Sequence, residues 1–102
     1  MLIIKKLSRM IKEEIADAEK YANCALNHKE DDKGLADTFY TLANEELNHM
    51  DMLHTQVVRL INAYRKENGE VPPAMQAIYD YVREEQIENV KEVKLLLNMY
   101  KE

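Results

Sequence analysis

The chain has 102 residues, of which 46% are hydrophobic, and this size and composition predict a single domain with enough apolar side chains for a core. It contains only two glycines and two prolines, which favours an all-α protein. The net charge of −5 and the pI of about 5.2 argue against a nucleic-acid-binding protein, which would carry a basic face.

The single cysteine and the charged residues near the N-terminus narrow the class of protein further. Cys24 is the single cysteine, so neither an internal disulfide nor a Cys-x-x-Cys metal site is expected. The apolar first residues are interrupted by Lys5, Lys6 and Arg9, so we expect no signal peptide and no membrane span. These features predict a cytoplasmic protein.

The first predicted helix covers residues 3–27. Its apolar positions recur every three or four residues, as on one helix face, and the acid Glu14 takes one of these positions. A short polar segment follows, in which Asp31 or Asp32 is suited to cap the next helix. A connection this short predicts that the first two helices are antiparallel neighbours.

The second predicted helix, residues 32–67, carries the most informative pattern. Its inward stripe is apolar and consists of Leu35, Phe39, Leu42, Leu53, Val57, Leu60 and Tyr64. Continuing the same spacing between Leu42 and Leu53 reaches Glu46 and His49, where apolar side chains are expected. A buried carboxylate is costly unless it is paired or bound to a metal.

The spacing of Glu46 and His49 suits a metal ligand pair. Glu-x-x-His puts both side chains on one side of the helix, one turn apart, and helical bundles use this spacing to present a carboxylate and an imidazole to one ion. Glu45 is a rival to Glu46, because residues four apart, such as Glu45 and His49, also share a face.

The third predicted helix covers residues 73–101, after Asn68-Gly69 and two prolines end the second. Its apolar stripe is less regular and includes Glu85, with Glu88 one turn further along. Residues 84–88 also echo residues 45–49, with Glu85 in the place of Glu46 and Glu88 in the place of the histidine.

Acids thus occupy inward positions on all three predicted helices. Several carboxylates at one height would repel each other unless cations neutralised them. Carboxylates with an imidazole suit iron or manganese better than a structural zinc. The alternative is that each acid lies at the edge of its stripe and reaches water, with His49 an ordinary core or surface histidine.

Two segments resemble the ferritin-like and rubrerythrin-like superfamily. Residues 14–21 place Tyr21 seven positions after Glu14, and residues 46–49 match the Glu-x-x-His motif of these proteins. The resemblance implies a four-helix bundle with a di-iron or di-manganese site. Within it, Glu14 would be a terminal or bridging ligand, Glu46 a bridging ligand, His49 a terminal ligand and Tyr21 a neighbour of the ligands.

The resemblance covers about two thirds of the chain, and the third helix departs from it. That helix offers Glu85 and Glu88 but no histidine, and a fourth helix is absent. Glu85 and Glu88 could complete a site within one chain. Alternatively, two chains could each supply Glu14, Glu46 and His49 at a two-fold axis, as in the short encapsulated ferritin-like proteins, which this chain resembles in length.

In either case we expect a homodimer or a larger homo-oligomer, because three unequal helices leave apolar surface to cover. The resemblance implies iron binding, with manganese or zinc as alternatives, and oxidation of Fe(II) by oxygen or peroxide in iron handling or oxidative-stress protection. An external electron donor and an enclosing shell would be the further partners. The alternative function is a non-enzymatic helical dimerisation module of degenerate ferritin-like fold.

Overall fold

The computed structural model describes residues 1–102 and contains three α-helices and no strands. They are α1 (Leu2–His28), α2 (Lys33–Asn68) and α3 (Pro73–Lys101). The prediction of an all-α bundle of three helices is confirmed, and each helix end lies within one residue of the predicted range. No segment of these helices combines the length and the apolar character that a bilayer span requires.

Local signals set both ends of α2. Asp32 is the N-cap, and its carboxylate accepts a hydrogen bond from the Leu35 backbone N–H at 3.1 Å. Of the two predicted candidates, Asp31 and Asp32, the second therefore caps the helix. After the last turn, Gly69 has a φ of +80°, and its N–H donates to the carbonyl of Arg65 at 2.9 Å. Glycine adopts this left-handed conformation without the steric cost of a Cβ.

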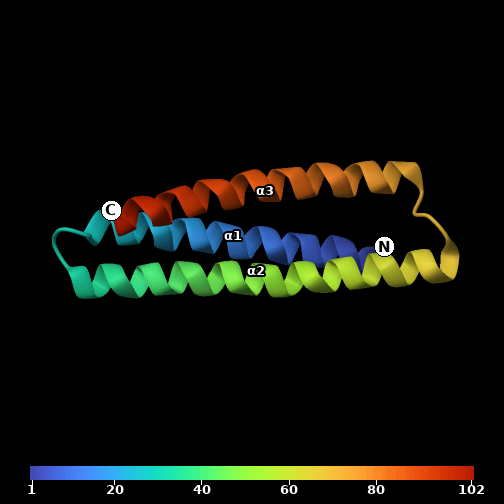
Figure 1. The fold of residues 1–102 in the computed structure, drawn as a ribbon. Helices are drawn as coiled ribbons and strands as arrows, with labels where there is room; N and C mark the ends of the chain where they lie inside the picture. The colour runs from blue at the N-terminus through green and yellow to red at the C-terminus, as the bar shows by residue number, and fades with distance from the viewer.

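The helices lie side by side along one long axis, and the molecule measures 56 × 18 × 18 Å (Figure 1). α1 packs along both other helices, whereas α2 and α3 touch each other at few positions. All three contribute to the core, where Ile11, Val57 and Val93 are the largest fully buried side chains. The bundle is thus held together through α1.

The end of α3 is fixed near the turn between α1 and α2. The Tyr100 hydroxyl donates a hydrogen bond to the Asp37 carboxylate, and the Tyr100 ring stacks on Tyr40 with 5.1 Å between the ring centroids. The hydrogen bond from Tyr100, followed by that from Lys33, lowers the pKa of Asp37. The ammonium of Lys29, the residue that follows α1, donates to the Met99 carbonyl near the end of α3 at 3.3 Å. This end of the bundle is therefore closed.

Most of the stripe predicted for α2 lies at the edge of the core, and of its residues only Val57 is fully buried. Phe39, Leu42, Leu53 and Leu60 are half-buried, and Leu35 is 40% exposed. Apart from Val57, the buried face consists of neighbouring positions, namely Ala36, Ala43, Leu47 and Met50. Alanine is only weakly hydrophobic, so it contributes little to a hydrophobic pattern. Buried alanines nevertheless indicate a close contact between helices, because small side chains let two helices approach.

The inward polar residue of α3 is Gln86, so the prediction of Glu85 on the inward stripe is wrong. Gln86 is 5% exposed, and its side-chain amide donates to the Ser8 carbonyl of α1 at 3.3 Å. Val93 follows Gln86 by seven residues, which is about two turns of helix, and Leu97 follows Val93 by four, which is about one turn. The three side chains therefore share one face of α3. Glu85 is rotated from this face by about 100° and is exposed.

The N-cap gives a test of the fold. Replacing Asp32 by Ala removes the acceptor of the Leu35 N–H, so we expect the free energy of unfolding to fall by about 1 kcal/mol in urea denaturation. The matched control is Asp31→Ala, which removes only an exposed contact with His28 at 3.2 Å and should change stability little. Equal losses in the two variants would contradict the assignment of the cap.

Candidate metal centre

Three of the predicted ligands come together between α1 and α2. Glu14 of α1 and Glu46 and His49 of α2 each offer a ligand atom, and these atoms all lie within 4.8 Å of one another. His49 Nδ1 is 3.5 Å from Glu14 Oε2 and 3.7 Å from Glu46 Oε2. Glu46 and His49 share a side of α2 because they are three residues apart, and the packing of α1 brings Glu14 to them.

The three side chains differ in exposure. The Glu14 and Glu46 side chains are 26% and 19% exposed, whereas the His49 side chain is 52% exposed. One carboxylate oxygen, Glu14 Oε2, is buried and has no hydrogen-bond partner. A buried charged oxygen without a partner is costly, and a cation between the three side chains would remove that cost. The group therefore fits a metal ion.

The two carboxyls also influence each other's protonation. The pKa of Glu46 is raised, first because the neighbouring Glu14 carboxyl can share its proton, then by burial and by the charge of Glu14, and His49 opposes this effect. Two nearby carboxylates cannot both ionise without repulsion. Without a metal, the pair is therefore most stable when it holds a proton, and a bound cation would take the place of that proton.

The donor set indicates which ions suit the group. Two carboxylates and one imidazole are ligands for iron and manganese, and they also bind zinc. These ions take four to six ligands, so an ion held by three side chains would keep coordination positions open. An arrangement of this kind can bind an ion and still admit a small oxidant or another ligand.

The remaining acids of the predicted set are not part of this group. Glu45 is exposed and lies outside the group, which contains Glu46. Glu85 is exposed and lines a cleft between α1 and α3. Glu88 is exposed and forms an ion pair with Lys91 at 3.3 Å. A site completed within one chain by the acids of α3 is therefore not formed in this structure.

The predicted neighbour Tyr21 and the other two histidines of the chain have ordinary surroundings. Tyr21 stacks on Phe39 with 6.1 Å between ring centroids, two turns of α1 away from Glu14. His28 faces Asp31 in the turn between α1 and α2. His54 is half-buried, and burial lowers its pKa. None of these residues joins the group of three.

Comparison of the chain with models of known protein families, with curated proteins and with solved structures gives no match. A role for the three residues can therefore be inferred only from their geometry and chemistry in this chain.

The protonation of the pair predicts how stability depends on pH. The pKa of Glu46 is higher in the folded protein than its ordinary value of 4.5. The folded state thus binds this proton more tightly, and the resulting stability is complete below pH 4.5 and is lost as the pH rises through the folded pKa. Glu46→Gln mimics the protonated acid, so the metal-free variant should lack this loss and unfold at a higher temperature than the wild type at pH 7.

The control for this measurement is Glu45→Gln on the exposed side of the same helix. Thermal unfolding in the presence of a chelator, at several values between pH 4 and pH 8, compares the three proteins. Glu45→Gln could raise the unfolding temperature at neutral pH as much as Glu46→Gln does. That result would attribute the gain to the net charge of the protein and not to the protonation of the Glu14–Glu46 pair.

Proposed function

We propose that this protein is a ferritin-like di-metal carboxylate protein that binds iron through Glu14, Glu46 and His49 and oxidises Fe(II). The observation that carries the proposal is the buried Glu14 Oε2, which lacks a hydrogen-bond partner and faces a second carboxylate and an imidazole. Its ion pair with His49 Nδ1 at 3.5 Å does not include a hydrogen bond, whereas a cation between the three side chains would bind it. Manganese and zinc are the alternative ions for the same ligands.

The proposed site is shared by two copies in an antiparallel four-helix arrangement. Two copies of Glu14, Glu46 and His49 amount to a Glu from each of two helices and a Glu-x-x-His from each of the other two, which is the ligand set of di-iron bundles. Support comes from the surroundings of the group, where half-buried apolar side chains continue along the same flank of α1 and α2, namely Leu7, Tyr21, Phe39, Leu42 and Leu53. A second copy would cover them.

The proposed chemistry follows from the charge of the ligands. Fe(II) is the substrate, and each ion gives one electron to oxygen or peroxide. Anionic carboxylates favour the higher charge of Fe(III), and the open coordination positions admit the oxidant. An external donor would return electrons in a peroxide-scavenging cycle, whereas an enclosing shell would be needed for iron storage. Both of these partners belong to the proposal.

Iron binding is the direct test. After anaerobic loading with Fe(II) and desalting, we expect one iron per chain and a dimer by light scattering. His49→Ala should lose at least tenfold in iron affinity, because a ligand is removed, and should slow the formation of Fe(III) followed by its absorbance. The control is His54→Ala on the same helix outside the group. Equal iron content in the wild type and His49→Ala would contradict the site.

The second candidate function is a helical dimerisation module without metal. It is favoured by the closeness of the Glu14 and Glu46 carboxyls, which raises the pKa of Glu46, because two carboxyls that share a proton can satisfy each other. The flank of α1 and α2 that the second copy would cover would then be the functional surface.

Glu46→Leu separates the two functions. Leucine at this half-buried position should keep or raise the unfolding temperature of the metal-free protein in both cases, because a polar group in apolar surroundings is removed. In a metal protein the same change should abolish retained iron, manganese and zinc, as measured by elemental analysis. If neither the wild type nor the variant retains any of these metals, and both remain dimers, the dimerisation module is the correct function.

A further inference from the structure

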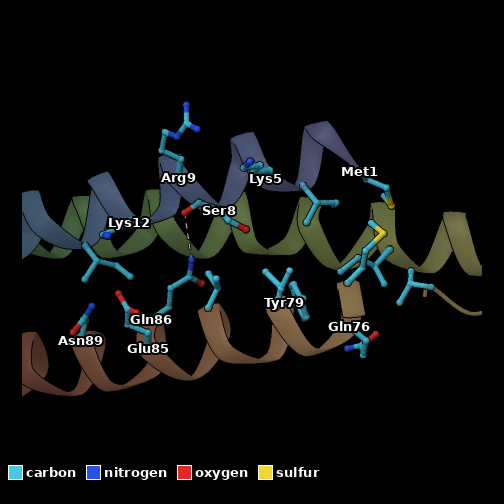
Figure 2. Close-up of a pocket in the computed structure, with 17 residues that line it drawn as sticks. Met1, Lys5, Ser8, Arg9, Lys12, Gln76, Tyr79, Glu85, Gln86 and Asn89 are labelled. Atoms are coloured by element: carbon cyan, nitrogen blue, oxygen red, sulfur yellow. Dashed lines mark hydrogen bonds between the residues drawn. The ribbon is translucent and has the colours of Figure 1, made fainter. Parts of the chain in front are cut away.

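A cleft of about 580 Å³ opens at the other side of α1 from the candidate metal centre. It lies between the first half of α1, the end of α2 and the first half of α3 (Figure 2). Its apolar wall includes Ile4, Ile61, Val71, Met75 and Val82. This volume is within the range of about 300–1,000 Å³ that is typical of small-molecule sites.

The cleft exists because α3 diverges from α1 toward the N-terminus of α3 (Figure 1). The hydrogen bond between Gln86 and Ser8, drawn in Figure 2, joins the two helices across the cleft. Beyond it, Met75 and Ile78 are 37% and 66% exposed, whereas Val93 in the second half of α3 is fully buried. Exposed apolar surface costs about 25 cal/mol per Å², so an apolar ligand would gain by covering it.

The rim of the cleft is basic in a protein that is acidic overall. Residues 1–12 contain four of the 14 lysines and arginines of the chain and no acid. Lys5, Arg9 and Lys12 line the cleft, all three are exposed, and none forms an ion pair. Figure 2 shows Lys12 on α1 across the cleft from Glu85, the one acid among the lining residues. The excess of positive charge favours an anionic ligand.

We propose that this cleft binds a single-chain anionic amphiphile, a long-chain carboxylate. The acyl chain lies against the apolar wall, and the carboxylate lies near Lys5 and Lys12. A second copy of the chain is a poorer occupant, because a two-fold contact would place the same basic rim on both sides, and like charges would face each other. The metal site contributes no residue to this cleft, so the inference does not depend on the proposed function.

The probe for the experiment is cis-parinaric acid, a linear carboxylate whose fluorescence rises in apolar surroundings, used below its aggregation concentration. We expect saturable binding of one probe per chain and displacement by palmitate. The variant K5Q/R9Q/K12Q should weaken binding at least tenfold. The matched control K6Q/R59Q/K66Q removes the same charges outside the cleft and should bind as the wild type does. The methyl ester of the probe should bind more weakly than the acid.

A second pair of variants tests the apolar wall. Val82→Trp fills the cleft and should abolish saturable binding, whereas Val58→Trp, at an exposed position of α2 outside the cleft, should leave it unchanged. Circular dichroism establishes that each variant is folded. His49→Ala should bind the probe normally, which separates a failure here from a failure of the metal site.

Three results would overturn the proposal. The first concerns the probe, which would show no saturable binding to the wild type, or an equal loss of affinity in the two triple variants. The second is sedimentation with phosphatidylglycerol vesicles without binding of monomeric probe, which would assign this end of α1 to a membrane surface. The third is a dimer by light scattering that Val82→Trp converts to a monomer, which would assign the cleft to a second copy of the chain.

Discussion

The close contact between α1 and α2 is the constraint on which the other features of this protein depend. It is made by alanines that are completely buried, with Ala18 and Ala43 in one core cluster and Ala25 and Ala36 in another. Small side chains bring two helix axes together, and the reach of a glutamate is only a few bonds. Glu14 can therefore meet Glu46 and His49 from the opposite helix. Larger residues at the alanine positions would move Glu14 away from Glu46 and His49 without changing any of the three.

This contact also explains why the polar group is tolerated. The carboxyls lie at the edge of the core, where His49 is half exposed, and not among the fully buried residues such as Ile11 and Val57. Full burial of two carboxylates would cost far more than the fold of a small domain can offset. A cation bound at this edge would be in surroundings apolar enough to strengthen its attraction to the carboxylates, yet open enough for water to enter.

Much of this arrangement could be predicted from the sequence, because it depends on local signals. Asp32 and Gly69 define the ends of α2, and the interruption of an apolar pattern by Glu46 and His49 indicates a polar site at the right place. The cleft could not be predicted, because it results from the divergence of two helices, which no local pattern records. The cluster of cations in residues 1–12 was its one signal in the sequence.

The failure at Glu85 has a different cause. One residue along a helix changes its direction by about 100°, so an irregular apolar pattern leaves the inward face of α3 uncertain by that angle. Glu85 and Gln86 are both polar, and hydrophobicity alone cannot choose between them. The choice depends on Val93 and Leu97, which continue the face of Gln86 into the closed end of the bundle. An echo of the Glu-x-x-His motif was a weaker guide than this tertiary contact.

The same geometry implies that α1 can serve two sites without conflict between them. Leu7, Glu14 and Tyr21 follow one another at seven-residue intervals on the flank toward the candidate metal centre. Lys5 and Lys12 are displaced from Leu7 and Glu14 by two residues, which is about 200° around the helix axis. A second copy on the flank would thus leave the cleft open, and a ligand in the cleft would leave Glu14 free.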